Sequence, residues 1–303
     1  MEEGLAKKVF FKKEDGSVWI DLTADGLDEK IVQRKDGTAV YITQDIGLAV
    51  NKYEEYHCDE SIYVVGDEQN YHFKVLKLIC QKLKIPAADH IFHLSYGMVE
   101  LPTGRMKTRE GNVVDADDIV DEMIREAERK TKEQGKTEGF TEVELKDLYE
   151  MIGIGGLKFF LLRVDPKKRM LFNTEESIDL HGYTATFIQY AHARIKSILR
   201  KEEGFAHTGK TNSPLLPLEK ALIIALEKFP LTIEQACTEM SPSLIASYAF
   251  DLAKSFNSFY AEHSIAKAET PDKKELRLQI AQLTATTLKN AMALLGIKVP
   301  ERM

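Results

Sequence analysis

The stretch from Ile91 to Val114 constrains the fold more than any other part of this 303-residue chain. Residues 91–99 are mostly apolar or aromatic up to a glycine, which is typical of a buried strand. A short loop with three cations and two glycines follows at once. Ligands of open α/β sheets bind beyond the carboxyl ends of the strands, and three cations there suit a polyphosphate. A solvated hairpin with scattered charge is the alternative, because basic loops are common.

The residues before this stretch predict strands that alternate with helices. We expect strand, helix, strand, helix and strand, in this order, at residues 39–43, 45–56, 61–66, 72–83 and 91–99. This order predicts a βαβαβ unit with right-handed crossovers. Asp15-Gly16 predicts a further hairpin close to the N-terminus.

The second half of the chain is expected to be helical. A charged helix is predicted over 116–132, and a second helix over 141–163 contains glycines that indicate a break or close packing. Amphipathic spacing predicts a helix over 272–295, with Gly296 as its C-terminal cap. The predicted fold class is therefore α/β followed by all-α. We expect the first domain to span residues 1–176 and the helical domain to span 177–303.

Composition excludes several classes of protein. A net charge of −7 and a pI near 5.7 argue against a wholly basic nucleic-acid coat, although a local basic surface is compatible with them. The three cysteines are far apart and form no Cys-x-x-Cys pair, which argues against a disulfide framework and structural zinc. Neither a long apolar span nor a signal peptide is recognisable. We expect a cytoplasmic protein with reduced thiols and no membrane association.

Polar residues follow the first two predicted strands of the unit. Tyr41 and Asp45 lie where the first strand meets its helix, and Gln69 and His72 follow the second strand. Because the carboxyl ends of parallel strands share one edge of a sheet, these side chains are candidates for a common pocket. The simpler interpretation makes Asp45 a helix N-cap, Gln69 a loop amide and His72 an ordinary first-turn residue.

The basic loop resembles the second signature loop of class I aminoacyl-tRNA synthetases, in the version found in arginyl-tRNA synthetases. Met106 matches the family pattern, whereas Thr108 stands where the second lysine of the pattern is expected. The Tyr-x-Thr-x-Asp sequence at 41–45 and the Gly-x-x-Gln-x-x-His sequence at 66–72 also resemble that family. The resemblance implies part of a Rossmann-like nucleotide-binding domain, connecting helices and a helical anticodon-binding bundle.

The resemblance also implies roles for individual residues. Arginine would be bound by Tyr41, Asp45 and Gln69, whose acceptor groups suit a guanidinium. ATP would be held by His72, Gly97, Met98, Met106, Lys107 and Thr108. Charge on the triphosphate would be stabilised by Lys107 and Arg109, with Arg105 as a third candidate.

Residues 187–194 resemble the start of the anticodon-binding bundle of the same family. Spacing alone predicts only an amphipathic helix with a polar stripe. The resemblance implies tRNA contacts by Gln189, Tyr190, His192, Arg194, Tyr260 and the terminal Met303. For Tyr260, core packing is an equally good interpretation. Basic residues between 158 and 169 form a local patch that would face tRNA phosphates or simply solvent.

The resemblance implies arginine–tRNA ligation: ATP-dependent formation of arginyl-adenylate and transfer of arginine to the 3′ end of arginine tRNA. Mg²⁺ would accompany ATP, no tightly bound metal is expected, and the protein would act as a monomer. No His-x-Gly-His signature occurs in the sequence. We therefore expect a C-terminal portion of the enzyme that is inactive alone. The rival functions are a non-catalytic tRNA-binding module derived from a synthetase and a nucleotidyl transferase of similar fold.

Overall fold

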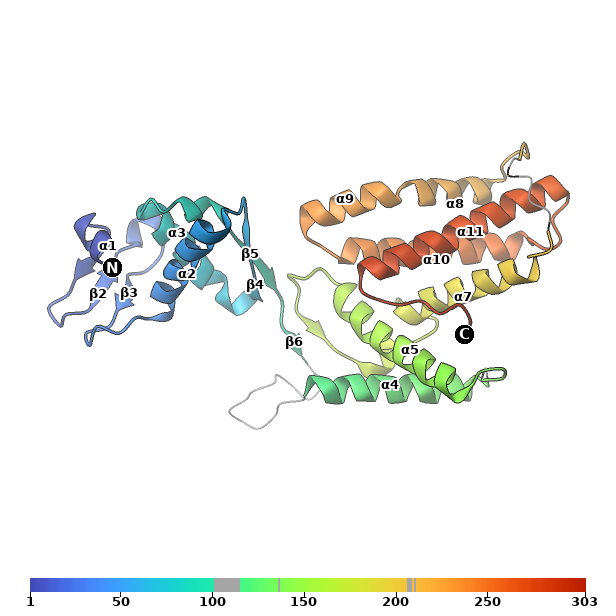
Figure 1. Cartoon of the computed structure of the whole chain (residues 1–303), viewed down its shortest axis with the longest axis horizontal. Helices are drawn as coiled ribbons and strands as arrows, with labels where there is room; N and C mark the ends of the chain where they lie inside the picture. Colours follow the sequence, from blue (N-terminus) through green and yellow to red (C-terminus); the bar gives the residue numbers. More distant parts are fainter. Residues whose placement is uncertain (101–114, 136, 206–208, 210) are drawn as a thin grey trace. The chain divides into compact units, whose positions relative to one another are not determined.

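The computed structural model describes residues 1–100, 115–135, 137–205, 209 and 211–303. The chain forms two compact units, Met1–Met98 and Val99–Met303, which are considered separately (Figure 1). The predicted domain boundary after residue 176 falls within the second unit. Among the described residues, no helix is both long and apolar enough to cross a bilayer.

The first unit contains two small sheets and three helices. Strands β1 and β2 form the predicted antiparallel hairpin, and β3 extends it to three strands. Strands β4 and β5 pair in parallel and are connected through α3. The elements are α1 (Glu2–Ala6), β1 (Phe11–Lys12), β2 (Val18–Ile20), β3 (Lys30–Gln33), α2 (Tyr41–Tyr56), β4 (Ser61–Gly66), α3 (Asn70–Lys82) and β5 (Ile91–Tyr96).

The predicted strand at residues 39–43 is wrong. Helix α2 begins at Tyr41 with Val40 as its N-cap, and Ala39 forms only an isolated bridge to Gln33. The apolar run is short, and periodicity cannot distinguish a short buried strand from a buried helical turn. The inward-facing Ile42 begins a helical face that continues into α2. The described part of this unit therefore contains a βαβ motif instead of βαβαβ.

One face of the β4–β5 sheet packs on the core of the first unit. The strands pair in register from Ser61 opposite Ile91 to Gly66 opposite Tyr96. On the inner face, the ring of Tyr63 lies 5.2 Å from that of Phe73 on α3. The ring of His93 stacks on Phe73 at 4.2 Å. These contacts join both strands to α3 and hold the carboxyl ends of the strands beside the start of that helix.

The second unit begins with a short parallel strand pair and two long helices. Strand β6 (Val99–Glu100) pairs with β7 (Met170–Leu171), and helices α4 (Ala116–Glu133) and α5 (Glu142–Leu162) pack together. Helix α5 is continuous through its glycines. A Cβ on Gly153 would lie 2.9 Å from the backbone of Ile124, so this glycine permits close packing of α4.

The remainder of the second unit is helical, as predicted. Phe256 and Phe259 are fully buried in its core. The buried carboxylate of Glu219 accepts hydrogen bonds from Lys273 at 2.7 Å and Arg277 at 2.9 Å, which ties α8 to α11. Gly296 has a φ of 67° just after α11, as expected of its cap. The helices are α6 (Thr174–Ser177), α7 (Ala185–Lys201), α8 (Pro217–Glu227), α9 (Phe229–Glu239), α10 (Ser243–Glu262) and α11 (Pro271–Leu294).

Candidate functional site

The structure brings together two of the predicted pocket residues in the first unit. The Nε2 atom of His72, in the first turn of α3, lies 2.6 Å from Oδ2 of Asp45 on α2. An ionised carboxylate only accepts hydrogen bonds, so Nε2 carries the hydrogen in this contact. The side chains are 25% and 34% exposed, respectively, so the pair is accessible to a ligand while its geometry is held by two helices.

Asp45 is not a helix cap. It is the fifth residue of α2, and the N-cap residue Val40 makes no side-chain capping bond. The capping interpretation is therefore wrong because the helix begins four residues earlier than the sequence pattern indicated. The observed partner of Asp45 lies 27 residues further along the chain. The sequence signal for this pair was the predicted position of both residues after neighbouring strands, and for Asp45 that predicted strand is absent.

The other residues predicted to bind arginine or ATP in the first unit lie at the start of α2, directly before α3 and just after β5. Tyr41, the first residue of α2, is 80% exposed. Gln69 is exposed directly before α3. Gly97 is buried just after β5, while Met98 is 37% exposed. Tyr41, Gln69 and Met98 are therefore accessible to a ligand, whereas the backbone at Gly97 is covered.

The predicted phosphate-binding loop lies outside the described residues. This applies to every member of the signature sequence, namely Arg105, Met106, Lys107, Thr108 and Arg109. Among the residues that the structure does describe, no group of three or more His, Cys, Asp or Glu side chains is arranged to hold a metal ion.

In the second unit, part of the polar stripe of α7 lines a hollow. The hollow has a volume of about 600 Å³, and its lining includes Phe187, Tyr190, Arg194 and Asn257. The guanidinium carbon of Arg194 lies 5.6 Å from the ring centres of both Tyr190 and Tyr260. Aromatic rings beside a guanidinium offer stacking surfaces and positive charge, the two features that unpaired RNA bases use.

Two other residues of the stripe are buried instead. Gln189 is fully buried, and its amide nitrogen donates to the carbonyl oxygens of Met151 and Lys298 at 3.1 and 2.9 Å. His192 is 1% exposed, and its Nδ1 lies 2.9 Å from the carbonyl oxygen of Pro300. Burial lowers the pKa of His192 below its usual value. The structure thus assigns Gln189 and His192 to holding the C-terminal segment, and neither presents a surface to RNA.

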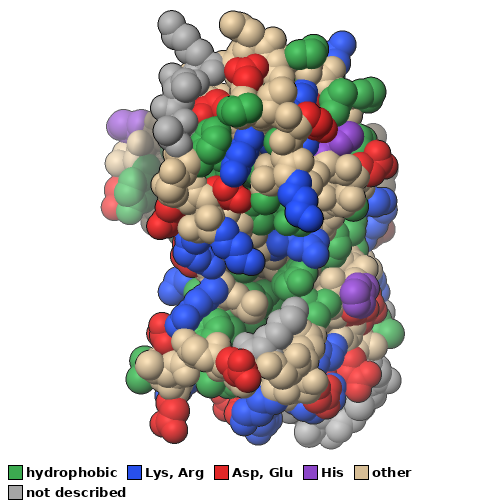
Figure 2. All heavy atoms as spheres, turned by 90° about the vertical axis from the view of Figure 1, so that its right-hand side faces the viewer, with side chains coloured by type: hydrophobic (Ala, Val, Ile, Leu, Met, Phe, Trp, Pro, Cys, Tyr) green, Lys and Arg blue, Asp and Glu red, His purple; other side chains and the backbone are tan. Residues whose placement is uncertain are grey.

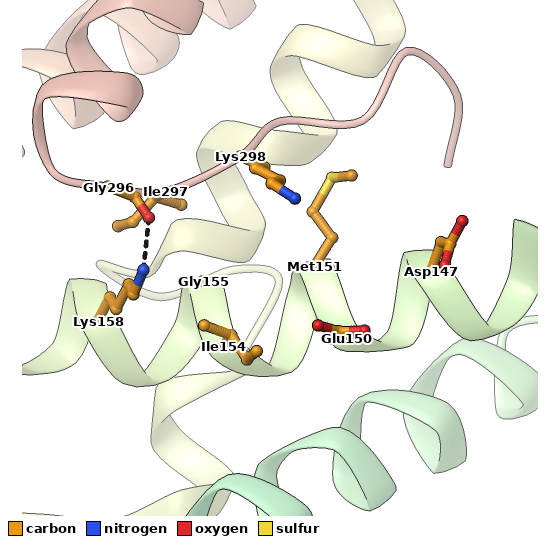
Figure 3. A pocket seen from close by; sticks show the side chains of 9 residues that line it. All are labelled: Asp147, Glu150, Met151, Ile154, Gly155, Lys158, Gly296, Ile297 and Lys298. Atoms are coloured by element: carbon orange, nitrogen blue, oxygen red, sulfur yellow. Dashed lines mark hydrogen bonds between the residues drawn. The ribbon is translucent and has the colours of Figure 1, made fainter.

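The C-terminal segment, residues 296–303, is fastened along α5 and α7 by further side chains. Lys158 on α5 donates to the carbonyl oxygen of Gly296 at 2.8 Å beside a hollow of about 370 Å³ (Figure 3). Arg302 binds Glu144 at 2.6 Å near the start of α5. Met303 is half-buried and packs against the core between α4 and α5. Lys158, one of the predicted basic-patch residues, therefore has a structural partner.

The basic patch predicted between 158 and 169 is only partly a surface feature. The side chain of Arg163 is 12% exposed and binds Glu176 at 2.6 Å. Its guanidinium also lies 4.2 Å from the ring of Phe160. Lys and Arg side chains do gather across the middle of the face shown in Figure 2. Within the predicted patch itself, Lys167 and Lys168 are exposed, although Arg163 is engaged within its own unit.

Comparison with known proteins assigns both halves of the chain. Residues 2–173 match the model of the tRNA synthetases class I (R) catalytic domain, and residues 188–303 match the DALR anticodon binding domain. An arginine–tRNA ligase of Flavobacterium psychrophilum is 53% identical over 99% of this chain and 50% of its own length. That of Amoebophilus asiaticus is 50% identical over 99% of the chain and 51% of its own length.

Solved structures of arginyl-tRNA synthetases match the fold of the whole chain. Thermus thermophilus arginyl-tRNA synthetase superposes with a TM-score of 0.84 at 25% identity, covering the whole of this chain and 58% of that one. The Plasmodium falciparum enzyme shares the fold, with a TM-score of 0.80 at 21% identity, over 100% of this chain and 51% of its own. The chain spans about half the length of the curated relatives that it matches. It belongs to the class I arginyl-tRNA synthetase family.

Proposed function

We propose that this chain carries the arginine pocket, part of the ATP site and the anticodon-binding bundle of an arginine–tRNA ligase. The ligase forms arginyl-adenylate from arginine and ATP and transfers arginine to the 3′ end of arginine tRNA. The observation that carries this proposal is the match of catalytic and anticodon-binding models, in that order, along almost the entire chain. Residues 1–176 form the catalytic part and residues 177–303 the anticodon-binding part.

In this proposal, Asp45 and Gln69 accept hydrogen bonds from the arginine substrate. A guanidinium presents several donors in one plane and is best satisfied by carboxylate and amide oxygens. The contact with His72 occupies Oδ2 of Asp45 and orients the carboxylate, which leaves Oδ1 for the substrate. The exposed ring of Tyr41 packs on the aliphatic stem of arginine.

ATP binding involves both described and undescribed residues. His72, Gly97 and Met98 contact the nucleotide, with Gly97 allowing the backbone to approach adenine. Met106, Lys107, Thr108 and Arg109 hold the phosphates together with Arg105. Mg²⁺ accompanies the triphosphate and neutralises part of its charge. Thr108, in place of a lysine, leaves one charge to be supplied by a group elsewhere in the enzyme.

The hollow beside α7 binds unpaired bases of the tRNA. Tyr190, Arg194 and Tyr260 provide stacking and charge there, and Met303 contributes an apolar contact at the end of the clamped C-terminal segment. Because Gln189 and His192 are buried, their part in tRNA binding is indirect: they hold the backbone that leads to Met303. We further propose that the ligase is a cytoplasmic monomer.

Arginine-dependent ATP–pyrophosphate exchange with arginine tRNA present tests the catalytic proposal. Residues 1–303 contain no His-x-Gly-His sequence, so we expect no exchange from this polypeptide alone. We expect exchange from a chimeric enzyme in which the half of the Flavobacterium psychrophilum ligase that this chain does not match is fused to it. A folded chimera that binds arginine tRNA but lacks exchange would favour the non-catalytic tRNA-binding module. Exchange by the chain alone would contradict the assignment of an incomplete ATP site.

A further inference from the structure

The helices that carry Asp45 and His72 begin without side-chain caps. The residues that precede α2 and α3, Val40 and Gln69, make no capping hydrogen bond with their side chains. The first backbone N–H groups of a helix have no partner within the helix, so an uncapped start is held less firmly than the turns that follow it. The position of the Asp45–His72 pair, at 2.6 Å, therefore depends on other contacts of the two helix starts.

Tyr71 fastens the start of α3 to the chain just before β3. Its hydroxyl donates to Oδ2 of Asp28 at 2.8 Å and accepts from the backbone N–H of the same residue at 3.3 Å. Lys30, the first residue of β3, places its Nζ 4.5 Å from the centre of the Tyr71 ring and 3.6 Å from Oδ2 of Asp28. The phenol is therefore held at its ring and at its hydroxyl by one short segment of the chain.

The start of α2 is fastened to the same segment. The hydroxyl of Thr43, the third residue of α2, donates to the backbone carbonyl oxygen of Val32 in β3. Val32 is fully buried, so this end of the contact is fixed by the core of the first unit. Asp45 follows Thr43 by two residues. The segment from residue 28 to residue 32 thus holds both helix starts, one through Thr43 and the other through Tyr71.

We propose that Tyr71 is a positioning residue of the arginine pocket. Its bonds to Asp28 fix the start of α3. Gln69 directly precedes this helix and His72 lies in its first turn, so both depend on Tyr71 for their distance from α2. Tyr71 is 40% exposed and the side chain of Asp28 is 78% exposed, so their contact contributes little to the free energy of unfolding. The role in arginine binding rests on the proposed function, whereas the contact itself does not.

The first test is Tyr71→Phe in the chimeric enzyme. The substitution removes the hydroxyl and keeps a ring beside Lys30. We expect the KM for arginine in pyrophosphate exchange to rise about three- to tenfold, with kcat little changed, because ground-state contacts to the substrate are misplaced. The KM for ATP should rise less. A merely structural role predicts a different pattern, in which fewer folded molecules lower kcat and leave both KM values unchanged.

Variants of Asp28 show whether Tyr71 acts through this carboxylate. Asp28→Ala should raise the KM for arginine as Tyr71→Phe does, and the double variant should raise it no further. Asp28→Asn removes the charge but keeps an acceptor for the hydroxyl, so it should restore most of the affinity. Tyr56→Phe, at an exposed tyrosine of the same unit, is the matched control and should change nothing. An unchanged KM in the Tyr71→Phe variant, or effects of the two substitutions that multiply, would overturn the proposal.

The second test needs no catalysis. In proton NMR of the 303-residue chain, the Nε2 proton of His72 that faces Asp45 should give a resonance that His72→Gln removes. We expect Tyr71→Phe to broaden this resonance, because a looser start of α3 exposes the proton to exchange with water. Tyr56→Phe should leave it unchanged. A resonance that is absent from the unmodified chain, or unaffected by Tyr71→Phe, would contradict the proposal.

The two tests separate the positioning role from the function. If the unmodified chimera shows no pyrophosphate exchange, the catalytic proposal fails, while the NMR result still decides whether Tyr71 holds the Asp45–His72 pair. If the resonance depends on Tyr71 but the KM for arginine does not, the contact is purely structural and the positioning role is wrong.

Discussion

His72 in the first unit and His192 in the second lie in sequences typical of the same family, yet their surroundings differ. His72 is partly exposed and faces a carboxylate at the ends of two helices. His192 is 1% exposed and faces a backbone carbonyl of the C-terminal segment. The first arrangement leaves polar groups that a charged ligand can reach, whereas the second places the imidazole inside the fold, with Nδ1 against the backbone. A polar motif residue can therefore serve either binding or architecture, and burial distinguishes the two.

The largest effect is expected from Asp45→Asn in the chimeric enzyme. Loss of a charged partner typically costs about 2–5 kcal/mol of binding free energy, so arginine affinity should fall about 30-fold or more. The melting temperature should change little, because the site is partly exposed and asparagine can still accept from His72. Arginine titrations and thermal melts measure the two quantities. Lower stability with unchanged arginine affinity would place Asp45 in the same structural class as His192.

Gln189→Ala should produce the opposite pattern. It removes the donor to two part-buried carbonyl groups, and a buried group left unpaired costs at most about 1–3 kcal/mol. We expect calorimetry of the 303-residue chain to show a lower melting temperature, with arginine affinity of the chimeric enzyme unchanged. Gln282→Ala on the exposed face of α11 is the control. If both alanine variants melt like the unmodified chain, the proposed clamp on residues 296–303 contributes no stability.

Tyr190→Ala should weaken tRNA binding. A stacked base contributes about 1–3 kcal/mol, which corresponds to about 5- to 150-fold in affinity. Filter binding of arginine tRNA to the chimeric enzyme measures the change, and Tyr56→Ala, at a 68% exposed tyrosine in the first unit, is the control. Unchanged affinity together with a lower melting temperature would move Tyr190 from the binding class to the structural class.

The smallest effect concerns pH. Because burial lowers the pKa of His192 in the folded chain, the unfolded chain takes up its proton first as the pH falls. The stability that neutral, buried His192 contributes to the folded chain is fully present above about pH 6.5, the ordinary pKa of histidine. It is lost as the pH falls below this value, with a slope of at most about 1.4 kcal/mol per pH unit for one proton.

Calorimetry at pH 7.5 and 5.5 measures this slope. His192→Gln should reduce the pH dependence of the second unit, while His181→Gln, at an exposed histidine, should retain it. Identical pH dependence in the unmodified chain and the His192→Gln variant would show that the burial of His192 does not affect stability. Burial would then no longer distinguish His192 from His72.

Local patterns in the sequence were sufficient for most elements. The parallel strands at 61–66 and from residue 91, the connecting helix, and the helices α4, α5 and α11 of the second unit follow from apolar periodicity and capping residues. The arginyl-tRNA synthetase family followed from the basic loop at 105–111 and from short sequences around residues 41–45, 66–72 and 187–194, and the family models confirm it. These features depend on residues close together in the chain.

The tertiary structure alone decided which polar residues are accessible. Asp45 meets a histidine 27 residues away, and Gln189 and His192 meet backbone atoms 109 and 108 residues away. The exposure of a side chain depends on the segments that cover it, and in α7 those segments include the far end of the chain. Helical spacing placed Gln189 and Tyr190 on adjacent positions of one amphipathic helix, but only the packing of α5 and of residues 296–303 buried the first and left the second beside a hollow.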